Sequence, residues 1–64
     1  MNNQNFDIQT TFNLAIENQK KNNFTEATKF YEKILEFNPN HFESNFYLGT
    51  LHAQKKILKE HQNL

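Results

Sequence analysis

The 64-residue sequence contains no cysteine, tryptophan or arginine, and only one glycine and one proline. Because cysteine is absent, a disulfide framework and a thiolate metal site are both excluded. Seven lysines balance seven acidic residues, so no excess charge points to a nucleic-acid or membrane partner. No run approaches the ~18 apolar residues of a transmembrane helix, and the chain does not start with a signal-peptide pattern. We therefore expect a cytoplasmic protein.

The chain is rich in amide side chains and in phenylalanine. It holds eleven Asn, five Gln and seven Phe. Asn-rich composition is typical of some disordered segments, but aromatic residues that recur with a helical period argue against disorder. Only residues 1–6 show no period, and we predict that they form a disordered or frayed N-terminus.

Apolar spacing predicts two helices separated by a tight turn. Ile8, Phe12 and Ala15 recur at intervals of three and four, which places them on one helical face. The pair Asn22-Asn23 predicts a break, because Asn tolerates the left-handed backbone conformation that closes a helix.

The second helix, over residues 24–37, is strongly amphipathic. It must stop by Asn38, since Pro39 disfavours helical geometry in the residue before it. For a third helix, Asn40 is the expected cap, with Glu43 three residues later as its capping-box partner. A fourth apolar segment is expected over residues 57–64, after two consecutive lysines.

A shift of 34 residues superimposes the apolar pattern on itself. It pairs Ile8 with Phe42, Phe12 with Phe46, Leu14 with Leu48 and Ala15 with Gly49. A period of this length with two antiparallel helices per unit predicts an all-α fold of helix-turn-helix repeats.

Residues 24–27, Phe-Thr-Glu-Ala, and residues 30–40, which end in Asn-Pro-Asn, resemble the second helix of a tetratricopeptide repeat (TPR). The resemblance implies a TPR-type α-solenoid fragment. Its first unit would span residues 7–40, and its second unit, residues 41–64, would be truncated within its second helix. Ala15, Ala27 and Gly49 would be small because the two helices of a unit cross closely there.

Few residues could carry chemistry. His41, His52 and His61 lack the spacing of a shared metal site. Ser44 has no flanking glycine turn to make it a nucleophile, and a single glycine, Gly49, cannot form a phosphate-binding loop. We predict no enzyme activity, no cofactor and no metal.

The resemblance implies a protein-interaction scaffold whose first helices line a concave groove for a peptide or partner helix. The corresponding groove positions are Gln9, Phe12, Ile16, Gln19, Lys20, Glu43, Phe46, Thr50, Ala53 and Gln54. Relatives that bind chaperone C-terminal tails carry a lysine and an asparagine where this chain has Phe12 and Ile16, so such tails are not expected. Alternatively, the apolar groove residues pack against another part of a longer parent chain.

Two further alternatives stay open. An uncovered repeat edge favours self-association, here through Leu58, His61 and Leu64. The resemblance also allows an N-terminal array of a larger bacterial enzyme, such as a glycosyltransferase or methyltransferase.

Overall fold

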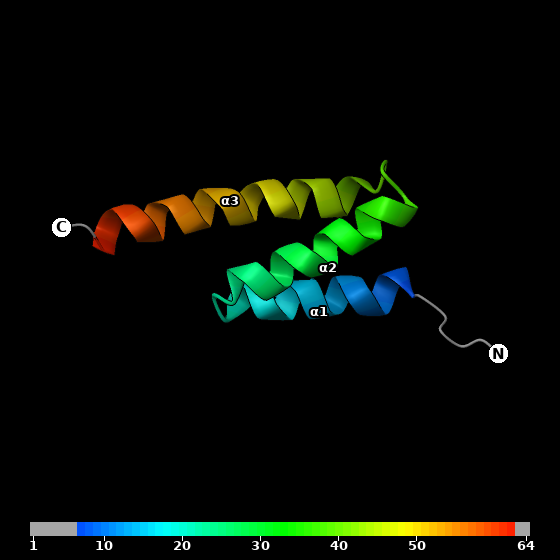
Figure 1. The fold of residues 1–64 in the computed structure, drawn as a ribbon, viewed down its shortest axis with the longest axis horizontal. Helices are drawn as coiled ribbons and strands as arrows, with labels where there is room; N and C mark the ends of the chain where they lie inside the picture. The colour runs from blue at the N-terminus through cyan, green and yellow to red at the C-terminus, as the bar shows by residue number, and fades with distance from the viewer. Residues whose placement is uncertain (1–6, 63–64) are drawn as a thin grey trace.

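The computed structural model describes residues 7–62 and the side chains of residues 7–60. Within these residues it contains three helices and no strand: α1 (Ile8–Lys20), α2 (Phe24–Phe37) and α3 (Phe42–Gln62) (Figure 1). The predicted all-α fold class is confirmed. The N-terminal segment predicted to be disordered, residues 1–6, lies outside the described residues.

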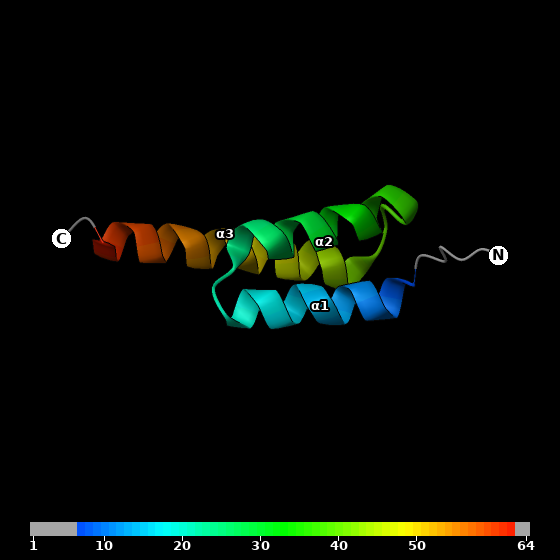
Figure 2. The same cartoon turned by 60° about the horizontal axis from the view of Figure 1, so that its bottom comes forward.

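The helices α1 and α2 form an antiparallel hairpin, and α3 lies beside both of them (Figures 1 and 2). The chain runs in the same direction along α1 and α3. The C-terminal part of α3 continues past the turn that joins α1 to α2. The molecule is therefore elongated, with extents of 51 × 21 × 13 Å.

The turn between α1 and α2 forms where the Asn pair predicted it. Asn22 adopts a left-handed conformation with φ of 64°. Its N–H donates to the Gln19 carbonyl at 3.0 Å, and the N–H of Asn23 donates to the Asn18 carbonyl at 2.8 Å. This pair of hydrogen bonds defines a Schellman motif, which satisfies the last carbonyls of α1.

The cap of α3 lies one residue later than the sequence predicted. The backbone N–H of Ser44 donates to Nδ1 of His41 at 3.1 Å, so the imidazole of His41 acts as the cap. The N–H of Asn40 instead donates to Oδ1 of Asn38 at 3.2 Å. Asn40 is thus held in the turn before the helix, and the expected capping pair of Asn40 and Glu43 is wrong.

The fourth apolar segment expected over residues 57–64 does not form a separate helix in the described residues. The helix α3 runs without interruption from Phe42 to Gln62. At the shift of 34 residues, Lys56 and Ile57 replace the turn-forming pair Asn22-Asn23. Lysine favours the helix, and isoleucine is a poor N-cap with a branched side chain that resists left-handed geometry. Residues 41–62 therefore contribute one helix, and the division into two repeat units stays a prediction.

The core lies where the three helices meet. Its buried apolar residues are Phe12, Ala15, Ala27, Tyr31, Ile34 and Leu51. Ala15 and Ala27 are fully buried between α1 and α2, as expected for small residues at a close helix crossing. Gly49 differs: it is exposed, and a Cβ built there would meet no described atom within 4 Å. No described helix crosses α3 at Gly49, so the reason predicted for this glycine is wrong.

Candidate functional site

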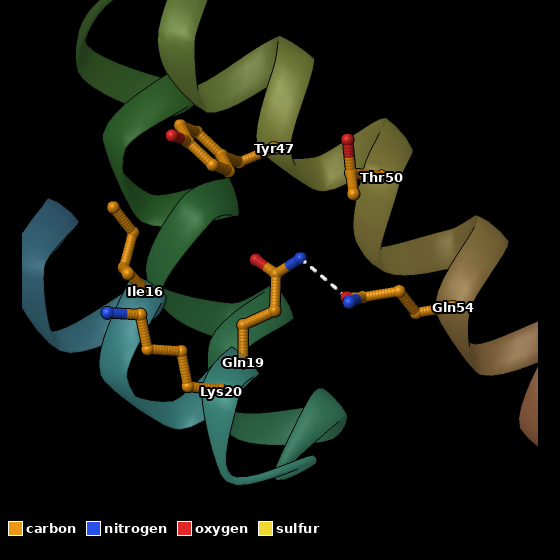
Figure 3. A pocket seen from close by; sticks show the side chains of 6 residues that line it. All are labelled: Ile16, Gln19, Lys20, Tyr47, Thr50 and Gln54. Carbon is orange, nitrogen blue, oxygen red and sulfur yellow. Dashed lines mark hydrogen bonds between the residues drawn. The ribbon is translucent and has the colours of Figure 1, made fainter.

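A pocket of about 200 Å³ lies between α1 and α3 (Figure 3). Each helix contributes three residues to it. In α1 the second and third of them lie three and four residues after the first, and in α3 they lie three and seven residues after it, so each set shares one face of its helix. The lining residues are Ile16, Gln19, Lys20, Tyr47, Thr50 and Gln54.

Five of these six residues were expected from the sequence to line a groove, and the structure brings them together. Tyr47 was missed, although it lies three residues before Thr50 and seven before Gln54 on the same helix face. That spacing was the signal that could have found it. Whether a partner contacts any of these residues stays a prediction.

A chain of hydrogen bonds supports one side of the pocket. The buried hydroxyl of Tyr31 donates to Oε1 of Gln19 at 2.7 Å, and Nε2 of Gln19 donates to Oε1 of Gln54 at 2.8 Å. Burial, and to a lesser degree the nearby Tyr47, raises the pKa of Tyr31 to about 12. The hydroxyl therefore keeps its proton and donates at neutral pH. In the described part of the chain, Nε2 of Gln54 has no acceptor, and this amide group is left available at the pocket.

The rest of the pocket combines apolar surface with one positive charge. Ile16 and Tyr47 are half-buried and supply aliphatic and aromatic surface. Lys20 is exposed at the end of α1, and its ammonium group has no ion-pair partner among the described side chains. The pocket can therefore hold an apolar group and offer hydrogen-bond donors to an acceptor beside it.

Phe12 is a core residue, which corrects its predicted place in the groove. Only 7% of its surface is exposed. Its ring makes edge-to-face contacts with Tyr31, His41 and Tyr47 at centroid distances of 6.1, 5.7 and 5.5 Å. Rings from α2 and from the start of α3 cover it, so it is not available to a partner. Helical spacing alone could not show that α3 would close over this position.

The other four predicted groove residues are exposed and lie outside the pocket. Nε2 of Gln9 donates to Oδ1 of Asn13 on its own helix at 3.1 Å. The rings of Phe46 and Tyr47 make an edge-to-face contact, with their centroids 5.4 Å apart. Glu43 and Ala53 are exposed on α3.

At the predicted association edge, only Leu58 has a described side chain. It is 39% exposed and lines a second, wider hollow beside the α1–α2 turn, of about 530 Å³. The other residues of this hollow are Asn22, Phe24, Lys55 and Lys59. The side chain of His61 and all of Leu64 lie outside the described parts, so the role of this edge stays a prediction.

The described residues contain neither a metal-binding cluster nor a membrane-spanning helix. No three His, Asp or Glu side chains there gather in a way that could hold a metal ion. None of the described helices has the length and apolar character required to cross a membrane.

An antiparallel helix hairpin followed by a third helix that packs on both of its members is the arrangement of α-helical repeat proteins. A family model described as a tetratricopeptide repeat matches residues 30–63, more than half of the chain. The chain therefore belongs to the TPR family. This membership indicates a protein-interaction repeat module, and such repeats are typically non-catalytic scaffolds. The searches found no match among curated proteins or among solved structures.

Proposed function

We propose that this protein binds a segment of a partner protein in the pocket between α1 and α3, and that it catalyses no reaction. Family membership supports the interaction role. The location is supported by the pocket itself, which combines apolar walls with an amide donor, Nε2 of Gln54, that has no acceptor among the described residues.

The size of the pocket suits one large apolar side chain. An apolar cavity of about 150 Å³ is large enough for a benzene ring, and this pocket measures about 200 Å³. Ile16 and Tyr47 provide the surface against which a phenylalanine or leucine side chain of the partner would pack.

The polar groups suit an acidic residue next to that anchor. Nε2 of Gln54 would donate to a carboxylate or carbonyl oxygen, and the Lys20 ammonium would add a charge-assisted contact. The preferred ligand is therefore an exposed or extended segment in which a large apolar residue adjoins Asp or Glu.

Titration with a short blocked peptide tests this proposal. The probe carries glutamate next to phenylalanine, and two matched peptides replace the glutamate with glutamine or the phenylalanine with alanine. In amide NMR spectra, the probe should shift the resonances of Ile16, Tyr47 and Gln54 and leave that of Glu32, on the outer face of α2, unchanged. The alanine peptide should cause no shifts, because it lacks the anchor.

A charge variant gives the matched control. Lys20→Gln should weaken binding of the glutamate peptide several-fold, because it removes one charge-assisted contact. The glutamine peptide lacks this contact and should bind more weakly, with the same affinity for the Lys20→Gln variant as for the wild type. Lys21→Gln is the control, because Lys21 does not line the pocket and its Nζ lies 3.9 Å from Oε2 of Glu17. Equal effects of the two variants, or shifts confined to other surfaces, would contradict the proposed site.

A further inference from the structure

The outer face of α3 carries an exposed apolar stripe, opposite the buried Leu51. Its members recur at intervals of three and four residues, which keeps them on one side of the helix. They are Phe42, Phe46, Gly49, Ala53 and Ile57. The exposed fractions of the three large side chains are 77% for Phe42, 58% for Phe46 and 54% for Ile57. None of the five lines the pocket between α1 and α3.

We propose that this stripe pairs with the same stripe of a second copy of the chain, with the two α3 helices antiparallel. The twofold axis passes between Gly49 and Ala53, so that each of these residues faces the other across the interface. The inference is independent of peptide binding in the pocket.

Gly49 supports the close approach of a second helix. Glycine destabilises the interior of a helix, and the fold does not require it here, because an added Cβ would meet no described atom within 4 Å. A second helix that crosses at Gly49 and Ala53 explains why these residues are small, because their small side chains let the two backbones come close. In the antiparallel register, Phe46 then packs between Ala53 and Ile57 of the second copy, as a knob enters a hole.

The charges along α3 favour a second copy in this orientation. Glu43 is the only charged residue of its N-terminal half, whereas its C-terminal half carries Lys55, Lys56 and Lys59 with a single acid, Glu60. Antiparallel pairing brings the acidic end of each helix to the basic end of the other. Parallel pairing would bring the lysines of the two copies together.

The area of the stripe sets the expected size of the dimer interface. From the burial typical of aromatic side chains, the three large residues offer about 300 Å² in each copy. With their neighbours, the pair would bury about 1,000 Å² in total, near the lower limit of specific interfaces. Interfaces of less than about 1,200 Å² belong to the weak, transient class, so we expect the dimer to form only at micromolar or higher chain concentrations.

Sedimentation equilibrium tests the pairing over chain concentrations from about 5 to about 300 μM. The weight-average mass of the wild type should rise from the 7.7 kDa of one chain toward twice that value. The weight-average mass of Gly49→Gln should stay at that of one chain. Its helicity by circular dichroism should be equal to or above that of the wild type, because the open space at this position accepts the side chain. The control His52→Gln, at an exposed position beside the stripe, should associate as the wild type does.

Each alternative result overturns the proposal. A wild type that stays monomeric shows that the stripe does not pair with itself, whatever the pocket binds. Assemblies larger than two chains exclude a closed twofold interface. Equal association of Gly49→Gln and the wild type excludes a crossing at Gly49.

Because the chain has no cysteine, cross-linking can test the orientation directly. A mixture of Gly49→Cys and Ala53→Cys chains should give a mixed disulfide under mild oxidation, since the two positions face each other. Ile57→Cys alone should give none, because the antiparallel register holds the two copies of this residue far apart. A disulfide in the Ile57→Cys protein would show parallel pairing and overturn the proposed geometry.

Discussion

At the scale of single residues, one buried hydroxyl links the core to the pocket. Tyr31 is fully buried in α2, yet its hydroxyl reaches Gln19 on α1, which in turn holds Gln54 on α3. A buried polar group is costly unless it is hydrogen-bonded. This short chain of hydrogen bonds therefore satisfies the Tyr31 hydroxyl and orients the amide groups of Gln19 and Gln54 at the pocket.

Removal of this hydroxyl should destabilise the protein although it leaves the ring in place. Tyr31→Phe leaves Oε1 of Gln19 without its hydrogen-bond donor, and Gln19 is a buried residue with only 7% of its surface exposed. We therefore expect a loss of about 1–2 kcal/mol in the free energy of unfolding. For a domain of this size, the melting temperature should fall by roughly 4–16 °C. Thermal unfolding followed by circular dichroism measures the change.

Tyr47→Phe is the matched control for this prediction. Tyr47 is half-buried, and its hydroxyl makes no hydrogen bond to the described residues, so its melting temperature should change little. Equal losses in the two variants would mean that the hydrogen bond to Gln19 does not stabilise the fold.

At the scale of elements, the caps decide where each helix begins and ends. Asp7 caps α1: its Oδ1 accepts the Gln9 N–H at 3.1 Å, and its Oδ2 accepts the Thr10 hydroxyl at 2.6 Å. The end of α1 and the equivalent position in α3, 34 residues later, also differ because of one residue. Asn22 closes α1, whereas Lys56 at the equivalent position lets α3 continue.

The cap of α1 should make part of the stability depend on pH. The hydrogen bond from the Thr10 side chain is the largest cause that holds the pKa of Asp7 below its ordinary value of 3.8. Because the pKa is lower in the folded state, this contribution is fully present above 3.8 and is lost as the pH falls through the lowered value. Acidification should therefore weaken the start of α1.

Comparison with Asp7→Asn isolates this effect from the other carboxylates. Asparagine still caps a helix but does not titrate, so its melting temperature should fall less than that of the wild type between about pH 5 and about pH 2. Parallel curves for the two proteins would show that Asp7 does not contribute to the acid sensitivity.

At the scale of the whole molecule, stability depends on the docking of α3 onto the hairpin. Leu51 is the one apolar residue of α3 that is buried in the core of the described chain. A chain of this length forms only a small core, which rarely supplies more than about 3–5 kcal/mol. A large share of the net stability therefore depends on this contact.

Leu51→Ala should detach α3 or unfold the protein. Loss of a buried leucine costs about 2–5 kcal/mol, which is comparable to the whole net stability. Helicity and hydrogen-exchange protection in residues 42–62 should drop sharply. Leu14→Ala is the control, because Leu14 is 40% exposed. This variant should keep both the helicity and the hydrogen-exchange protection of the wild type. A folded Leu51→Ala protein with α3 still protected would show that other contacts hold this helix.

Much of the architecture could be read from local patterns, because short-range geometry controls it. The turn at Asn22 and the end of α2 before Pro39 follow from backbone preferences of single residues, and the structure has both. The resemblance to the TPR family implied a close helix crossing at Ala15 and Ala27, and both residues are fully buried. The cap at His41 escaped prediction, since an imidazole that accepts a backbone N–H is an uncommon cap.

The sequence by itself determined the helical period and the first turn, because these depend on spacing along one helix and on the backbone preferences of single residues. Five of the six residues that line the pocket were expected from the resemblance to the TPR family. Only the tertiary structure decided that Phe12 is covered while Phe46 stays exposed, although the two positions are equivalent under the 34-residue shift. The physical reason is that α3 packs over α1, and no described helix packs over α3. Burial is thus a property of the neighbours that a helix finds, and one sequence period cannot distinguish a covered face from an open one.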